Sequence, residues 1–428
     1  MKKLNNYYYI KYFGCDMNKS DAERVSSILE SLKYKKTENI LDADIIIILA
    51  CSVRQTAADR IYGIFKDKKL KKTAIKILTG CVLKEDTKKL QKRFDIIIDI
   101  TKINNLPKLI SKKSEYNYDP KDVKYFNIIP NHNNYLALVP ISNGCNNFCT
   151  YCAVPYTRGL EKNRSARSVI NEVKGLEKNI KQIMLLGQTV NSYINPDKNT
   201  KIKDFGDLLE TVAKLKPDCW ITFISPYPTK FDDKLIKIIA KYENISHHIH
   251  IPLQSGNDRI LQMMNRKYNS KQFLTIINKI YKYIPNANIT SDVIVGFPTE
   301  SEKDFNDTLN VLKKAKITLV YSGLYSPRVG TVSYKIYKDD ISKVIKRKRD
   351  EKMTKIIAGQ SLERNKKYLG NIVKVLVQSK SKKDEYIGKM QTYETVKIKG
   401  INDKYIGQFV DVKIEKALNW RLEGKIVK

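Results

Sequence analysis

The chain has 428 residues, of which 42% are hydrophobic and 29% charged, and its 79 lysines and arginines exceed its 45 acidic residues by 34. This length predicts two or three domains. Because the sequence contains neither an apolar run long enough for a bilayer nor the apolar part of a secretory signal, we expect a cytoplasmic protein without a membrane partner. The positive charge favours a polyanionic partner such as nucleic acid, although a drift in composition toward lysine would also raise it.

The first part of the chain alternates strands with helices, and each strand is followed by a cysteine. Strands are predicted over 7–13, 43–50 and 74–79, and helices over 18–32 and 52–68. Such units predict a small parallel sheet covered by helices, followed by a polar linker over 111–134. Cys15, Cys51 and Cys81 therefore stand at the carboxyl ends of strands, where parallel sheets bind ligands. We expect them to converge on one iron–sulfur cluster, against the alternative of three separately buried thiols.

The loop 144–152 (GCNNFCTYC) contains the most specific motif of the chain. Cys145, Cys149 and Cys152 follow a C-x-x-x-C-x-x-C spacing. Thiolates are soft ligands, and a four-iron cluster held by three of them keeps one iron open for a small molecule. A structural zinc site would need a second cysteine pair, and none follows at the usual distance. The loop therefore predicts a catalytic iron–sulfur cluster.

The central part of the chain predicts an open barrel. Strands are expected over 135–142, 182–187, 220–225, 248–253, 289–296 and 318–325, with helices over 168–177, 232–241, 271–283 and 301–316. Six strand–helix units make a partial barrel with its chemistry at the carboxyl ends of the strands. His248 and His250 share one face of a strand and are expected at the barrel mouth rather than as metal ligands, and Cys219 is expected in the core.

The last part of the chain predicts a connector and a small β-barrel. Residues 342–367 are basic and helix-prone. Strands are then predicted over 372–378, 394–399, 408–416 and 421–427. Short strands of this kind form barrels of the OB-like type, which often bind nucleic acids.

Taken together, the motifs resemble those of the radical S-adenosylmethionine (SAM) methylthiotransferases over nearly the whole chain. They are 14–21 (GCDMNKSD), 50–54 (ACSVR), 79–81 (TGC), 144–152, 186–191 (LGQTVN), 252–256 (PLQSG) and 292–300 (DVIVGFPTE). The stretch 152–159 (CAVPYTRG) is similar to the branch that acts on N6-isopentenyladenosine beside the anticodon of tRNA. Leu160 departs from that branch, which tends to carry an acidic residue there.

The resemblance implies four segments and two kinds of cofactor. The segments are an N-terminal α/β domain over 1–118, a radical SAM barrel over 131–342, a basic helical linker over 343–366 and a TRAM β-barrel over 367–428. The cofactors are two [4Fe–4S] clusters, one on Cys15, Cys51 and Cys81 and one on Cys145, Cys149 and Cys152, together with SAM. SAM on the second cluster would yield the radical that abstracts hydrogen from C2 of the adenine, and methylated sulfur from the first cluster would couple there.

Further residues and partners follow from the same resemblance. Gln188, Ser225, Gln254, Arg266 and Asp292 are expected to hold SAM, and Arg158 and Arg328 to meet RNA phosphates or the modified base. A monomer that binds a tRNA anticodon stem-loop and an electron donor such as flavodoxin or ferredoxin is expected. Alternatives are N6-threonylcarbamoyladenosine as the substrate, an aspartate of a ribosomal protein, and an RNA-binding protein with a structural or redox-sensing cluster and no enzymatic activity.

Overall fold

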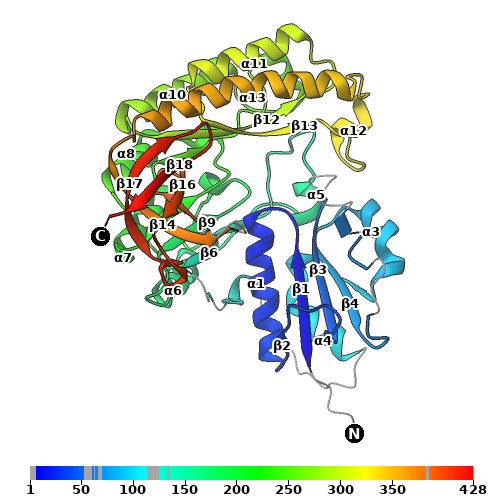
Figure 1. Ribbon diagram of the computed structural model, residues 1–428. Helices are drawn as coiled ribbons and strands as arrows, with labels where there is room; N and C mark the ends of the chain where they lie inside the picture. The colour runs from blue at the N-terminus through cyan, green and yellow to red at the C-terminus, as the bar shows by residue number, and fades with distance from the viewer. Residues whose placement is uncertain are drawn as a thin grey trace.

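The computed structural model describes residues 6–52, 60–61, 63–65, 70–112, 125–130, 132, 135–381 and 385–427. They form a parallel α/β sheet, a partial barrel and a small closed β-barrel, with a long helix before the last unit (Figure 1). The predicted helix over 52–68 and the linker over 111–134 lie largely outside the described residues. No helix among the described residues has both the length and the apolar character needed to traverse a bilayer.

The N-terminal unit is a parallel sheet, as predicted, and its strand order is β2-β1-β3-β4-β5. Its strands are β1 (Tyr7–Tyr12), β2 (Lys35–Lys36), β3 (Ile45–Cys51), β4 (Ile75–Cys81) and β5 (Ile96–Ile97). Its helices are α1 (Asp16–Ser31), α3 (Lys84–Leu90) and α4 (Leu106–Ser111). The central strand β3 is buried along its whole length, which explains its run of isoleucines. Strands β2 and β5 are too short to leave a pattern in the sequence.

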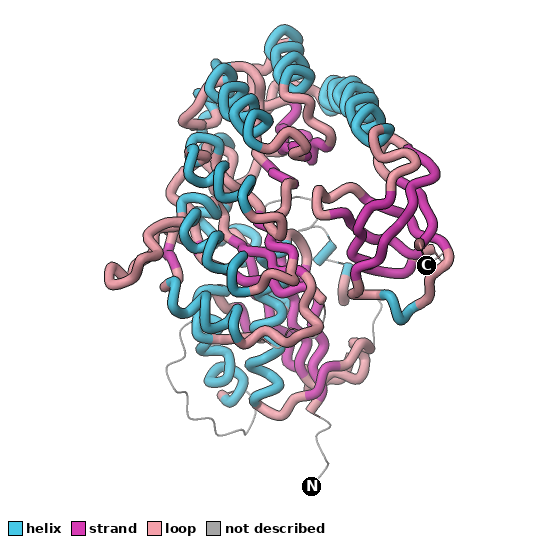
Figure 2. The backbone as a smooth tube through the Cα atoms, turned by 90° about the vertical axis from the view of Figure 1, so that its left-hand side faces the viewer, coloured by secondary structure: helices cyan, strands magenta, loops and turns pink. Residues whose placement is uncertain are grey.

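The partial barrel contains the six parallel strands that the sequence predicts. They are β6 (Leu136–Pro140), β9 (Gln182–Leu186), β10 (Trp220–Phe223), β11 (His248–His250), β12 (Asn288–Val295) and β13 (Leu319–Leu324). Its helices are α6 (Ala166–Lys174), α7 (Phe205–Leu215), α8 (Asp233–Lys241), α9 (Asp258–Met263), α10 (Ser270–Tyr283) and α11 (Glu302–Lys314). The halves β10-β9-β6 and β11-β12-β13 meet through a bridge between Ile221 and Ile245. Figure 2 shows the helices in a row outside the strands.

Short elements frame the cysteine-rich loop of the barrel. Strands β7 (Ser142–Asn143) and β8 (Lys162–Asn163) pair antiparallel, and α5 (Val154–Arg158) lies between them in the chain. Helix α12 (Val332–Ile336) follows β13. The 3-10 helices are η1 (Gln91–Arg93), η2 (Ile100–Asn105), η3 (Tyr125–Asn127), η4 (Val190–Ser192), η5 (Pro228–Lys230) and η6 (Asp403–Tyr405).

Helix α1 joins the N-terminal unit to the barrel by covering the edge strand β6. Figure 1 shows α1 between the N-terminal strands and the barrel. Met17 packs with Leu138 and Met184 in one apolar cluster. The Ser20 hydroxyl donates to the carbonyl of Leu138 at 3.2 Å, and Arg24 lies 3.6 Å from Glu172 of α6 with both side chains fully buried. The edge strand β6 is thereby covered by another unit of the same chain.

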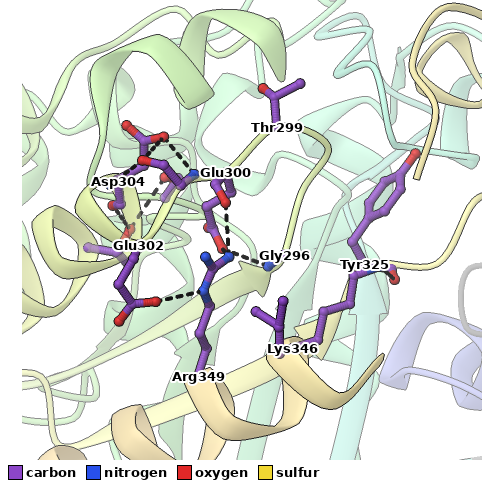
Figure 3. A network of polar contacts seen from close by, with 12 residues as sticks. Gly296, Thr299, Glu300, Glu302, Asp304, Tyr325, Lys346 and Arg349 are labelled. Atoms are coloured by element: carbon purple, nitrogen blue, oxygen red, sulfur yellow. Dashed lines mark hydrogen bonds and ion pairs between the residues drawn. The ribbon is translucent and has the colours of Figure 1, made fainter. Parts of the chain in front are cut away.

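The predicted basic connector is helix α13 (Lys343–Lys366), and side chains near its start attach it to the barrel. Arg349 Nη1 donates to Glu300 Oε2 at 2.9 Å, beyond the end of β12. Lys346 Nζ donates to the carbonyl of Tyr325 at 2.9 Å. Figure 3 shows both contacts on one side of α13. This helix is therefore fixed to the barrel rather than a free tether.

The C-terminal unit is a closed barrel with the strand order β14-β15-β16-β18-β17. Its strands are β14 (Ile372–Lys380), β15 (Tyr386–Met390), β16 (Thr395–Lys399), β17 (Phe409–Ala417) and β18 (Leu422–Ile426). Strand β15 was not predicted, because only two of its residues, Tyr386 and Ile387, carry a strand preference and a charged run precedes it.

The small barrel docks on the amino ends of strands of the larger one. The ring of Phe409 lies 4.6 Å from that of Trp220, which begins β10. The ring of Tyr393 stacks on that of His248, which begins β11, at 4.3 Å. Asn288, which begins β12, donates to the carbonyl of Thr392 at 2.7 Å. The carboxyl ends of the strands remain available for chemistry.

Candidate active site with two cysteine triads

Three cysteines meet at the carboxyl edge of the N-terminal sheet. Cys51 and Cys81 are the last residues of β3 and β4 and stand side by side in register, and Cys15 directly precedes α1. Gly14 lies beside them with a φ of +105°, and a Cβ there would approach Cys51 Sγ to 3.0 Å. Glycine is therefore needed both for the backbone conformation and for the close approach of this thiol. The structure thus brings these three cysteines together.

The other triad lies in the loop between β7 and α5. Cys145 and Cys149 are buried, and Cys152 is half-buried. Thr189 Oγ1 lies 3.4 Å from Cys145 Sγ, and Asn147 Nδ2 donates to the same sulfur at 3.3 Å. The backbone N–H of Val154 donates to Cys152 Sγ at 3.4 Å. Polar groups therefore already surround these sulfurs, as is usual for thiolate ligands.

Both triads line the same cavity, which has a volume of about 390 Å³. Gln188, Ser225, Gln254, Arg266 and Asp292 also line it, and they come from the carboxyl ends of the barrel strands or the loops beyond them. The backbones of Ser225 and Gln254 have φ values of +60° and +67°, which residues with a side chain rarely adopt. Such strain often marks a functional site, because the surrounding fold has to maintain it.

Each triad has an arginine that donates to one of its sulfurs, the half-buried Arg266 for one and the buried Arg158 for the other. Arg266 Nη1 lies 3.3 Å from Cys149 Sγ, and its guanidinium sits 4.6 Å and 4.9 Å from the rings of Tyr227 and Tyr268. Arg158 Nε donates to Cys81 Sγ at 2.9 Å. Two cations in a largely apolar pocket favour ligands that carry negative charge.

The donor set suits iron–sulfur clusters. Burial raises the pKa of the Cys81 and Cys152 thiols to about 12, so each needs a metal to deprotonate it near neutral pH. Among the residues that the structure describes, no three His, Cys, Asp or Glu side chains are grouped closely enough to chelate a single metal ion. Three thiolates on each side of the cavity are soft ligands of the kind that iron–sulfur clusters use.

Comparison with known proteins gives the family. Residues 139–312 match the radical SAM superfamily, 366–427 match the TRAM domain and 7–100 match the uncharacterized protein family UPF0004. A tRNA-2-methylthio-N(6)-dimethylallyladenosine synthase from Clostridium botulinum is 38% identical, with 98% of this chain and 96% of the relative covered. Synthases of the same name from Clostridium tetani and Fusobacterium nucleatum are 37% and 36% identical over 100% and 97% of this chain, and over 97% and 98% of their own.

The chain belongs to this synthase family. A fold likeness of another kind accompanies the family match. The radical S-adenosylmethionine methyltransferase TsrM from Kitasatospora setae superposes with a TM-score of 0.55 at 10% identity, over 77% of each chain. At that identity the likeness concerns the fold alone, and it agrees with the α/β architecture and open barrel described above.

Two residues of this synthase family member do not lie as the sequence suggested. Arg158 was expected to meet RNA, but its side chain is 1% exposed and pairs with Asp21 at 2.5 Å. A guanidinium that is held this way inside the protein is not available to a phosphate. Arg328 is 9% exposed, lies between β13 and α12, and is not among the residues that line the cavity. No local pattern in the sequence shows this burial, since most arginines are exposed.

Other residues of the site were missed or are placed as predicted. Asn18 was not singled out, yet it donates to the carbonyls of Phe13 and Ala50 at 2.7 Å and 2.8 Å and so shapes the backbone before two of the cysteines. Its place in the motif 14–21 was the available signal. His248 and His250 share a face, as predicted, because both rings lie within 3.0 Å of Thr290 Oγ1. The expectation that they lie at the barrel mouth is wrong for His248, which begins β11 at the end of the strand that the C-terminal barrel covers. Cys219 lies in the barrel core, also as predicted.

Proposed function

We propose that this protein adds a methylthio group to C2 of N6-isopentenyladenosine beside the anticodon of tRNA, by radical SAM chemistry. The observation that carries this proposal is the single cavity lined by both cysteine triads. An enzyme that must generate a radical and supply sulfur to the same carbon needs both centres within reach of one substrate. The name of the relatives supports the isopentenyl form of the substrate over the threonylcarbamoyl form and over a ribosomal protein.

We assign the clusters to the two triads. Cys145, Cys149 and Cys152 would hold the [4Fe–4S] cluster that binds SAM, and Cys15, Cys51 and Cys81 would hold the other. When bound, these clusters and SAM supply the electron, the radical and the sulfur for the reaction. The 1–118, 131–342, 343–366 and 367–428 segments remain our proposal for the domain organisation.

The side chains around the cavity would bind and orient SAM and the base. Arg266 offers a cation for a carboxylate, and Gln188, Gln254 and Ser225 offer hydrogen bonds to polar groups of a ligand. Asp292 can accept a hydrogen bond from a ribose hydroxyl, and it is itself held 3.3 Å from His250 Nε2. Apolar side chains such as Met17, Ile224 and Tyr227 line the remaining wall and would exclude water from the radical.

The charge of the chain supports an RNA partner. A net charge of +34 attracts phosphates, and the C-terminal barrel is a fold often used on nucleic acids. A base in an anticodon loop can be turned out of its stack and into a cavity, whereas a base within a duplex is harder to extrude. We therefore propose the anticodon stem-loop as the bound element, a flavodoxin or ferredoxin as the electron donor, and a cytoplasmic monomer as the working form.

Two measurements test this function. Mass spectrometry of tRNA nucleosides from cells with and without the gene should show loss of 2-methylthio-N6-isopentenyladenosine. The reconstituted Cys149→Ala variant should form no 5′-deoxyadenosine from SAM, because one ligand of the open cluster is gone. Cys219→Ala is the matched control, since this buried cysteine lies outside the cavity. SAM cleavage by Cys149→Ala at the rate of the control would show that the assignment is wrong.

A further inference from the structure

Arg158 is a residue of the barrel whose side chain reaches the cysteines of the N-terminal sheet. It ends helix α5 and stands six positions after Cys152 in the chain. Its guanidinium donates through Nε to Cys81 Sγ at 2.9 Å and through Nη2 to Asn18 Oδ1 at 2.8 Å. Nη1 donates to Asn143 Oδ1 of β7 at 3.1 Å. One side chain therefore bonds to a cysteine of the N-terminal triad on one side and, on the other, to β7, which leads into the loop of the other triad.

The way in which this guanidinium uses its donors is unusual for a structural ion pair. A buried arginine and a carboxylate are most stable when two parallel N–H groups meet the two carboxylate oxygens. Here Asp21 receives a hydrogen bond from Nη2 only, and its other oxygen accepts from the Tyr125 hydroxyl at 2.5 Å. The Nε edge, which could complete the fork, is directed at a sulfur instead. The arrangement gives up part of an ion pair to place a positive donor on Cys81.

Hydrogen bonds to ligand sulfurs are a main determinant of the reduction potential of an iron–sulfur cluster. One-electron reduction adds one negative charge to the cluster, with no bond made or broken in the protein. A cationic N–H at a ligand sulfur stabilises the reduced form more than the oxidised form, and so raises the potential. A nearby carboxylate acts in the opposite direction.

We propose that Arg158 is a positioning residue that raises the reduction potential of the N-terminal cluster from the barrel side. Asp21 acts in the opposite direction. The proposal rests on the assignment of Cys15, Cys51 and Cys81 as cluster ligands. It makes the electronic state of one centre depend on the docking of the other, because Arg158 belongs to the segment that carries the SAM-binding loop. Arg266 has no such reach, since its sulfur partner lies in its own barrel.

The test isolates the N-terminal cluster in the full-length chain. Cys145, Cys149 and Cys152 are replaced by alanine, the protein is reconstituted with iron and sulfide, and its midpoint potential is measured by redox titration followed by electron paramagnetic resonance. Asp21→Asn and the double variant Asp21→Asn with Arg158→Gln are compared in this background. The pair differs only in the arginine, and neither variant leaves a buried carboxylate without its cation.

The two substitutions should move the potential in opposite directions. Asp21→Asn should raise it above that of the parent, and the further change of Arg158 should lower it by about tenfold in the equilibrium constant for reduction, or about 59 mV for one electron. Asn143→Ala, which removes only the barrel-side partner of Arg158, should leave it unchanged. Equal potentials in the pair, or a shift in Asn143→Ala as large as that of the double variant, would overturn the proposal.

Loss of iron in these variants distinguishes the role of Arg158 from the assignment of the cluster ligands. If the double variant loses its iron, the Asp21→Asn variant decides, and a potential at or below that of the parent refutes the tuning role. If the parent with its three alanines and an intact Arg158 binds no iron at all, then the ligand assignment fails rather than the role of Arg158.

Discussion

Glu300 should control how the stability of the barrel depends on pH. Its side chain is 1% exposed, accepts the backbone N–H of Gly296 at 2.9 Å and pairs with Arg349 of α13 (Figure 3). Burial raises the pKa of its carboxyl from 4.5 to about 7, although the hydrogen bond from Gly296 and the charge of Arg349 both act against the rise. The protonated form is thus favoured by folding.

The magnitude follows from the pKa difference. Each pKa unit corresponds to about 1.4 kcal/mol, so the difference amounts to about 3 kcal/mol. Because the folded pKa is the higher one, this stability is fully present below pH 4.5 and is lost as the pH rises through about 7. Glu300→Gln removes the titration. The free energy of unfolding of the variant minus that of the wild type should therefore rise by about 3 kcal/mol between pH 4.5 and 8.

Thermal unfolding followed by circular dichroism between pH 5 and 8 measures this gain. For a unit of 150–250 residues, the expected change in the Tm difference between variant and wild type is about 5–10 °C. Glu302→Gln is the control, because Glu302 also bonds Arg349 at 3.2 Å but is 58% exposed. Its Tm curve should run parallel to that of the wild type. A Tm difference between Glu300→Gln and wild type that stays constant across this range would refute the reasoning.

Three further predictions concern the cluster loop, the docked barrel and RNA. Gly144→Ala should lose the iron of one cluster, because a Cβ there would collide with the carbonyls of Gly159 and Leu160. Gly359→Ala, where a Cβ meets open space, should keep this iron. Equal iron contents would contradict the steric argument. Tyr393→Ala should weaken the docking of the C-terminal barrel by about 1 kcal/mol, which faster amide exchange in β11 and β15 would reveal. Leu418→Ala is the control at an exposed site. Exchange in Tyr393→Ala no faster than in this control would show that the ring stacked on His248 does not stabilise the docking. Binding of tRNA should weaken steeply with salt, with a log–log slope of about −4 if about five phosphates are neutralised, and a flat dependence would exclude electrostatic attraction as its main source.

Much of the fold could be predicted because its elements carry local patterns. The buried isoleucines of β3 and the capping boxes that begin α10 and α11 are written in consecutive residues. The convergence of Cys15, Cys51 and Cys81 followed from a topological rule, since parallel strands end at the same edge. The sequence did not show which surfaces of the units pack against one another. The packing of α1 on β6 and of Tyr393 on His248 depends on faces that are far apart in the chain.

The burial of Arg158 is the clearest example of a contact between units that the sequence did not show. Its motif is recognisable in the sequence and favours a contact with RNA phosphates or the modified base, but no neighbouring residue indicates that the side chain is enclosed. In the structure, Asp21 and Asn18 arrive from α1 and Cys81 from β4, more than 70 residues earlier in the chain. Only the assembled units reveal that this guanidinium is enclosed by its own protein.

Because the C-terminal barrel docks on the amino ends of the strands, a fixed distance separates it from the cavity. Asn288, which begins β12, contacts the docked barrel, and Asp292 lines the cavity four residues later, so the two are roughly 13 Å apart at about 3.3 Å per residue. That length equals about four stacked nucleotides at roughly 3.4 Å each. An RNA that touches the C-terminal barrel while one of its bases enters the cavity must bridge this interval. The distance therefore sets a minimum length for the RNA, whatever its base sequence.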